Sequence, residues 1–116
     1  MNREELTALI RDEFGAEAEF LWADSPDDCI FRHGRNRKWF AVLMRVSAKK
    51  IGADGGQVDI LNVKCDPMLI GSLLKKPGYY PAYHMNKTHW LTVQPDRLSD
   101  GELYELINLS YGLTAR

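Results

Sequence analysis

The chain has 116 residues, of which 45% are hydrophobic and 27% charged. This size and composition are typical of one globular domain, so we expect residues 1–116 to form a single domain. The chain lacks an apolar run long enough to span a membrane, and its first five residues are polar and acidic, unlike a secretory signal. We therefore expect a cytoplasmic protein that does not contact membranes. Cys29 and Cys65 are too few for a disulfide framework and too far apart for a C-x-x-C metal pair.

The first predicted element is an amphipathic helix. Asn2 and Glu5 have the spacing of a capping box, apolar residues follow at helical intervals as far as Phe14, and Gly15 is a natural stop. Two β-rich runs follow, at 29–31 and 39–46. The segment 33–37 between them contains Gly and Asn, which predicts a β-hairpin with a basic tip. Residues 58–65 predict a further strand, and a strand at 19–22 remains an open alternative.

Both faces of the run 39–46 are apolar. One set of alternating side chains is Phe40, Val42, Met44 and Val46, and the other is Trp39, Ala41 and Leu43. Helices can cover only one face of a sheet, so we expect the second set to lie on an open or shared face.

The second half of the chain predicts two helices and one strand. Asp66 and Pro67 are an N-cap and a first-turn proline, and they begin a short helix that ends before Gly78. A loop of about a dozen residues, 77–88, is long enough to be functional, and residues 89–94 predict a strand. Ser99 and Glu102 form a capping box for a final helix closed by Gly112. The expected fold is an α+β two-layer sandwich with a mainly antiparallel sheet and helices on one face.

Charge is unevenly distributed although the net charge is only −1. Residues 1–31 carry nine carboxylates and two basic side chains, whereas residues 32–50 carry seven basic side chains and no acidic one. The two segments are solvated faces that pair with each other, or the basic one attracts a polyanion. In the second case the phosphate contacts would come from Arg32, Arg35, Arg37, Lys38, Lys49 and Lys50.

Three segments resemble the MmcQ/YjbR family of small bacterial proteins. They are Asn62-Val63-Lys64-Cys65-Asp66-Pro67, then Pro81-Ala82-Tyr83-His84-Met85-Asn86-Lys87-Thr88-His89-Trp90, and then Ser110-Tyr111. The resemblance is close over the C-terminal half, whereas residues 29–56 match least.

The resemblance implies a fold similar to type III secretion chaperones, with the order helix, three strands, helix, two strands, helix. It also implies DNA binding, through a double-wing arrangement, without a catalytic role. The site that the family would share comprises Lys64, His84, Asn86, Lys87, His89 and Trp90, and we expect these polar side chains to lie close together.

Other chemistry has weaker support. Cys65, Asp66, His84 and His89 are potential metal ligands, but their spacing fits no common zinc motif. A nucleophilic pair of Cys65 with either histidine is conceivable, although a cysteine that ends an apolar strand usually packs as a small hydrophobic residue. The chain contains no phosphate-binding glycine loop and no G-x-S-x-G motif. We expect neither an enzyme nor a cofactor.

Two functions remain open. The first is a non-enzymatic nucleic-acid-binding domain, with DNA as the expected partner, that uses the basic hairpin and the adjacent polar loop. The alternative is a protein-interaction module, a homodimer or an adaptor, that uses the second apolar face with Trp39 and Leu43. Trp90 is either a core residue or a stacking platform for bases, and the high average burial of tryptophan favours the core.

Overall fold

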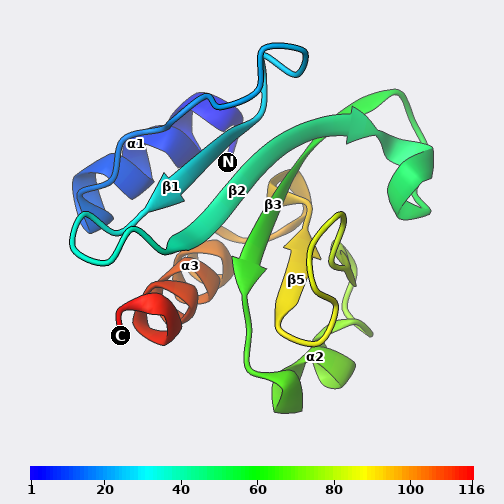
Figure 1. Ribbon diagram of the computed structural model, residues 1–116. Helices are drawn as coiled ribbons and strands as arrows, with labels where there is room; N and C mark the ends of the chain where they lie inside the picture. Colours follow the sequence, from blue (N-terminus) through cyan, green and yellow to red (C-terminus); the bar gives the residue numbers. More distant parts are fainter.

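The computed structural model describes residues 1–116 and contains three helices and five strands. In chain order they are α1 (Arg3–Phe14), β1 (Cys29–Arg32), β2 (Trp39–Ser47), β3 (Gln57–Lys64), α2 (Pro67–Leu73), β4 (Tyr79–Pro81), β5 (Trp90–Val93) and α3 (Asp100–Thr114). Two single-turn helices, η1 (Ala48–Ile51) and η2 (Pro95–Arg97), follow β2 and β5. This order confirms the expected α+β fold (Figure 1). None of the helices has both the length and the apolar character needed to cross a membrane.

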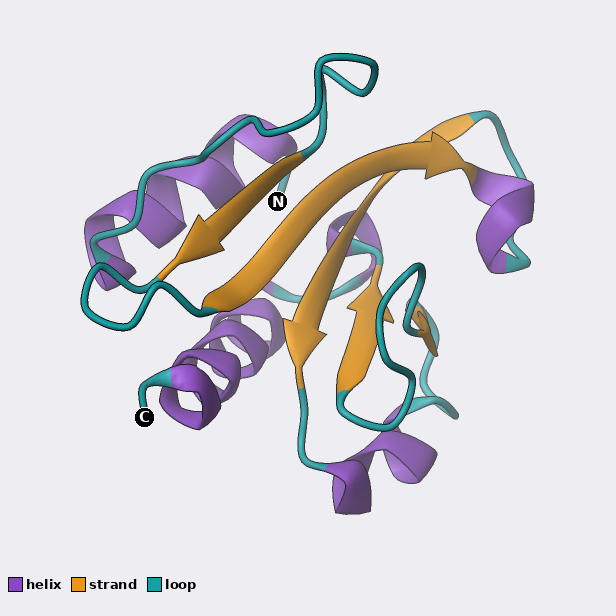
Figure 2. Ribbon diagram, in the orientation of Figure 1, coloured by secondary structure: helices purple, strands orange, loops and turns teal.

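The five strands form one antiparallel sheet in the order β1-β2-β3-β5-β4. Helices α1 and α3 cover one face of it, and α2 lies at the end of β3 (Figures 1 and 2). The main core lies between the two long helices and the sheet, and it includes Leu6 and Ile10 of α1 and Leu103 and Ile107 of α3. The opposite face, which carries no helix, is called here the helix-free face.

Local capping signals explain where the helices begin. The side chains of Asn2 and Ser99 accept hydrogen bonds from the backbone N–H groups of Glu5 and Glu102, and both glutamates return the bond. The carboxylate of Asp66 accepts from Met68 N, which starts α2. The prediction that the final helix ends at Gly112 is wrong, because α3 continues to Thr114.

The predicted faces of β2 are also wrong, because the strand contains a bulge. Phe31 pairs with Ala41 and Arg32 pairs with Trp39, so Phe40 has no partner on β1. The extra residue places Phe40 beside Ala41 and Leu43 in the main core. Trp39, Val42 and Met44 then share the helix-free face. Leu43, expected on the second face, has no solvent exposure.

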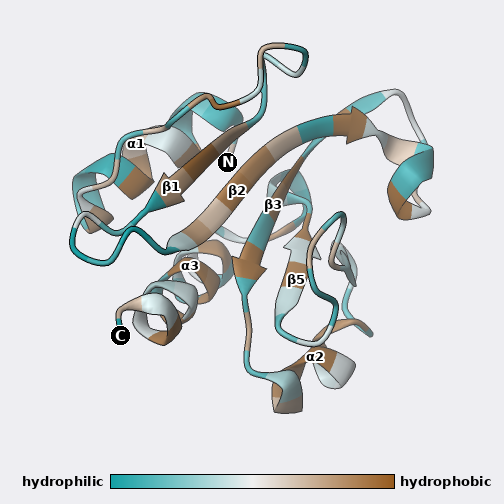
Figure 3. Cartoon of the chain, in the orientation of Figure 1, coloured by the Kyte–Doolittle hydropathy of each residue, from teal (hydrophilic) through white to brown (hydrophobic).

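Two strand predictions need correction. Residues 19–22 contribute one isolated bridge, between Glu19 and Ile30, instead of a strand. The predicted loop 77–88 contains the short edge strand β4, which pairs with β5. Figure 3 shows hydrophobic residues along β1 and β2, whereas β3 carries both hydrophobic and hydrophilic residues.

Candidate functional site

The loop between β4 and β5 is fixed over the helix-free face by two fully buried polar side chains. Asn62 of β3 donates from Nδ2 to the carbonyl oxygen of Tyr83 at 3.2 Å, and Tyr83 N donates to Thr92 Oγ1 at 2.8 Å. The hydroxyl of Thr92 completes the network by donating to Asn62 Oδ1. Buried polar groups that are satisfied by one another specify a single arrangement. The loop is therefore positioned by the sheet beneath it.

His84 occupies a special position in this loop. Its backbone has a φ of 58°, in the left-handed region. Its imidazole stacks on the ring of Tyr83, with centroids 4.0 Å apart and planes 13° from parallel. His84 is exposed and Tyr83 is half-buried. The loop thus presents a flat, partly exposed stack of two rings on a fixed backbone.

A basic cleft lies on one side of His84. Its volume is about 240 Å³, and its lining combines the loop with η1 and β4: Lys50, Ile51, Tyr80, Pro81, Ala82, Tyr83, His84 and Lys87. No carboxylate is among these residues. Lys50 and Lys87 are exposed, and neither forms an ion pair. This basic cleft is a place where an anion would meet two unneutralised ammonium groups.

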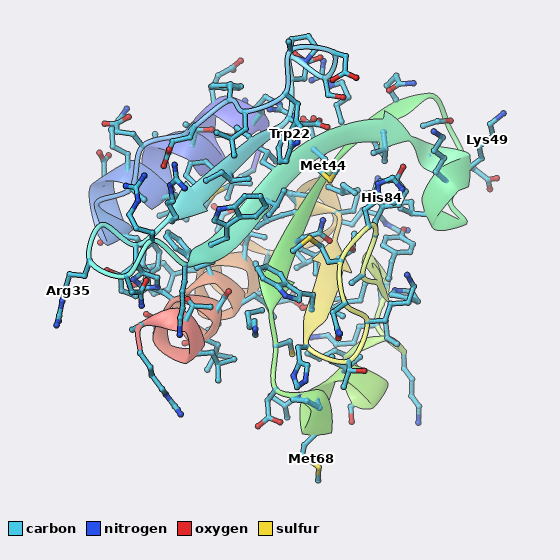
Figure 4. All side chains as sticks on the ribbon, viewed as in Figure 1. Trp22, Arg35, Met44, Lys49, Met68 and His84 are labelled. Atoms are coloured by element: carbon cyan, nitrogen blue, oxygen red, sulfur yellow. The ribbon has the colours of Figure 1, made fainter.

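An aromatic cavity lies on the other side of His84. Its volume is about 280 Å³, and it is lined by Trp22, Ser25, Asp28, Trp39, Val42, Met44, His84 and Met85. The rings of Trp22 and Trp39 meet edge to face, with centroids 6.0 Å apart. Trp22, Met44 and His84 lie close to one another in front of β2 and β3 (Figure 4). His84 lines both the basic cleft and the aromatic cavity, so the two adjoin at this residue, and together they are called the groove.

The tip of the predicted hairpin, residues 33–37, is absent from the lining of both cavities, and part of the basic charge around it is already neutralised. Arg32 forms an ion pair with Glu19, with N–O distances of 2.8 and 2.5 Å. Lys38 Nζ donates to the carbonyl oxygen of Arg116 at 2.5 Å. Asn36 donates to the carbonyl oxygen of Thr114, so the tip of the hairpin is tied to the end of α3.

The six predicted phosphate contacts do not form one surface. Arg35 and Arg37 precede β2, whereas Lys49 and Lys50 follow it in η1. β2 has nine residues, which at about 3.3 Å per residue separates the two pairs by about 30 Å. Arg35 and Lys49 accordingly lie at opposite ends of the molecule (Figure 4).

The predicted family site is also divided. His84 and Lys87 line the basic cleft. Lys64 instead lines a small cavity of about 140 Å³ beside α2 and α3, and its Nζ lies 5.6 Å from the centroid of the Trp90 ring. Lys64 therefore lines a different cavity from His84 and Lys87.

Two members of the predicted site have structural roles. The side chain of Asn86 accepts from the backbone N–H groups of Thr88 and His89, which closes the turn before β5. Trp90 is 9% exposed, which supports its interpretation as a core residue. The imidazole of His89 is exposed and forms no hydrogen bond.

The cysteines are placed for packing. Both Cys29 and Cys65 are buried in the main core. Burial raises the pKa of the Cys29 thiol to about 11 and raises the pKa of the Cys65 thiol as well. A thiol with a raised pKa is a poor nucleophile at neutral pH. The potential metal ligands of the sequence do not gather, because no three His, Cys, Asp or Glu side chains are arranged to hold an ion.

The sequence did not predict the aromatic cavity, which is one half of the groove. Trp22, Asp28, Met44 and Met85 come from four separate segments. No local pattern connects them, because they meet only through sheet pairing and the bulge at Phe40. The lone signal was the apolar character of both faces of β2.

Comparison with known proteins agrees with the fold. The model of the YjbR family matches residues 11–113. The uncharacterized protein YyaQ of Bacillus subtilis is 35% identical over 98% of both chains. The uncharacterized protein YbdF of Escherichia coli O157:H7 is 33% identical over 82% of this chain and 70% of its own. A crystal structure of a Pseudomonas syringae protein superposes with a TM-score of 0.95 at 44% identity, covering 98% of this chain and 99% of that one. The chain belongs to the YjbR family.

Proposed function

We propose that this protein is a non-enzymatic domain that binds single-stranded nucleic acid in the basic cleft. The observation that carries the proposal is that the Tyr83–His84 stack lines the same cleft as two lysines from different segments, Lys50 and Lys87. Single-strand-binding sites combine these two elements, a positive surface for phosphates and aromatic rings for bases.

Electrostatics supports an anionic ligand. The basic cleft has two ammonium groups and no carboxylate in its lining. The two lysines come from different segments, η1 and the loop after β4, and line one cleft. Such a pair can neutralise neighbouring phosphates and release their counterions.

Geometry favours unpaired bases over a duplex. The Tyr83–His84 stack is partly exposed, and a base can extend it only when the base is not paired inside a helix. Stacking of one base on an aromatic ring contributes about 1 to 3 kcal/mol. The hydrogen bonds from Asn62 and to Thr92 fix the loop before binding, which reduces the entropy cost of association.

Fluorescence anisotropy with labelled oligonucleotides over a salt series tests the proposal. We expect single strands to bind more tightly than a duplex, and a comparison of DNA with RNA shows which strand is preferred. The logarithm of the binding constant should fall by about 0.7 for each tenfold rise in salt and each phosphate neutralised. Undetectable binding, or binding independent of salt, would refute the proposal.

Charge reversal locates the site. The double variant Lys50→Glu and Lys87→Glu should weaken single-strand binding about tenfold or more, because both phosphate contacts are lost. The control is Arg35→Glu with Arg37→Glu, which makes the same change in net charge at the other end of β2. Equal losses in both double variants would mean that net charge, and not the basic cleft, governs binding.

A second candidate function is self-association, favoured by apolar side chains exposed on α2 and α3. Met68 is 86% exposed, and Leu69, Leu109 and Leu113 are exposed around the small cavity between these helices. Light scattering tests this candidate: Leu109→Glu should convert a dimer to a monomer, whereas Phe20→Glu, an exposed apolar site outside the patch, should not. A monomeric wild type would contradict it. Leu43→Glu cannot serve here, because Leu43 lies in the main core.

A further inference from the structure

The aromatic cavity has a composition that the basic cleft does not explain. Its walls are two indoles and two thioethers, from Trp22, Trp39, Met44 and Met85, and a single carboxylate, that of Asp28, reaches it. Its volume of about 280 Å³ lies near the lower end of the range for ligand pockets, about 300 to 1,000 Å³. A site of this size suits a small group.

The carboxylate of Asp28 is buried without a cation. Asp28 is 8% exposed, and Oδ1 accepts one hydrogen bond, from the backbone N of Arg45 at 2.9 Å. No ion pair involves Asp28. The guanidinium of Arg45 pairs instead with Asp59. No lysine or arginine lines the cavity. Since a buried charge is costly unless it is compensated, a cation bound beside Asp28 would offset this cost.

Aromatic faces beside a carboxylate form the chemistry that recognises organic ammonium ions. The ring quadrupole attracts a cation, and indole does so most strongly. The thioethers of Met44 and Met85 offer soft apolar contacts to methyl or methylene groups next to the charge. The other titratable group at the cavity is His84, at the border with the basic cleft.

We propose that the aromatic cavity binds the ammonium head of a small organic amine or of a lysine-type side chain, with Asp28 as its counter-ion. Trp22 and Trp39 would contact the cation, and the thioethers would contact its alkyl groups. This site is separate from the proposed nucleic-acid site, with which it shares only His84.

Titration with simple salts tests the proposal in the absence of nucleic acid. The probes are tetramethylammonium and butylammonium chloride at constant ionic strength, and the neutral control is 3,3-dimethylbutanol. NMR should show saturable shifts of the Trp22 and Trp39 indole N–H signals but not of the Trp90 signal, and the alcohol should bind at least about tenfold more weakly. Tighter binding of tetramethylammonium would indicate a quaternary amine, and tighter binding of butylammonium a lysine-type group.

Variants separate this site from its surroundings. Asp28→Asn keeps an acceptor oxygen for Arg45 N but removes the charge, and it should lower the affinity for the ammonium probes at least about tenfold. Asp24→Asn, an exposed carboxylate of the same segment, should leave the affinity unchanged. If Asp28→Asn does not fold, Trp22→Leu in the half-exposed loop serves as the second variant and should also weaken binding.

Three results would overturn the proposal. They are equal binding of the neutral alcohol, full affinity of Asp28→Asn, or no saturable shift with either salt. The double variant Lys50→Glu and Lys87→Glu should retain ammonium binding, so failure of the nucleic-acid proposal and failure of this one can be distinguished.

Discussion

Trp90 contributes to folding although it lies on the helix-free face. Its side chain is buried, and it pairs across the sheet with Lys64, whose ammonium lies over the ring. Trp90→Ala removes this packing and should lower the free energy of unfolding by about 3 to 5 kcal/mol. Urea melts followed by circular dichroism measure the change.

The control for Trp90 is Trp39, which is half-buried in the aromatic cavity. Trp39→Ala should cost less stability, because part of the indole already contacts water. A Trp90→Ala midpoint equal to that of the wild type would show that the indole does not hold the fold together.

His33 makes the stability of the hairpin depend on pH. Its imidazole bonds to Thr114 Oγ1 at 2.8 Å, and burial lowers the pKa of His33 below its usual value of 6.5. The unfolded chain then binds a proton more readily than the folded one. Stability should be complete above about pH 6.5 and should fall as the pH drops towards the lowered pKa.

The free energy of unfolding, measured from pH 7.5 to 5 by urea titration, tests whether stability falls as the pH drops. His33→Gln should flatten the fall in that window, because no proton is taken up at this position on unfolding. His89→Gln is the control, since His89 is exposed and unbonded, and it should leave the fall intact. A wild type that is more stable at pH 5 than at pH 7.5 would show that the sign is wrong.

At the scale of elements, the backbone conformation and close packing at Gly78, just before β4, disfavour any side chain. Its φ is 86°, and a Cβ there would lie 2.9 Å from Arg97 Cβ and from Leu98 Cδ1. Gly78→Ala should therefore lower the free energy of unfolding by about 1 to 3 kcal/mol.

Gly112 provides the contrast, because it is inside α3 and a Cβ would meet nothing within 4 Å. Gly112→Ala should stabilise the protein by about 0.5 to 1 kcal/mol. Thermal melts that rank the two variants in the opposite order would contradict both assignments.

The elements that sequence could predict are those controlled by nearby residues. The capping boxes at Asn2 and Ser99 and the Asp66 N-cap operate within one helical turn. The bulge at Phe40 escaped prediction because it depends on how β1 pairs with β2. The family resemblance implied two strands after α2, but the residues themselves did not indicate β4, because three residues ending in proline carry no periodic signal.

The end of α3 depends on tertiary contacts as well. Gly112 was a plausible stop, but the hydroxyl of Thr114 donates to the carbonyl oxygen of Ser110 at 2.7 Å and bonds to His33. These contacts continue the helix by two residues. They also connect the end of α3 to the hairpin.

At the scale of the whole molecule, a run of like charges in sequence is divided into two distant groups in space. The six expected phosphate contacts lie within the segment 32–50, but β2 separates the four that precede it from Lys49 and Lys50. Conversely, Lys50 and Lys87 are 37 positions apart in number yet line one cleft. Three residues of the basic cleft, Lys50, His84 and Lys87, were therefore among the predicted site residues. That they line one cleft depends on the fold and could not be predicted from the sequence.

Chemical-shift mapping by NMR can decide where a nucleic-acid strand lies on this molecule. The protein has a mass of 13.3 kDa, so the backbone amides can be followed while a single-stranded oligonucleotide is added. We predict that the shifts concentrate at Lys50, Tyr83, His84 and Lys87, with the segment 34–38 unchanged. Shifts centred on the segment 34–38, with residues 83–87 unchanged, would contradict the assignment of nucleic-acid binding to the basic cleft.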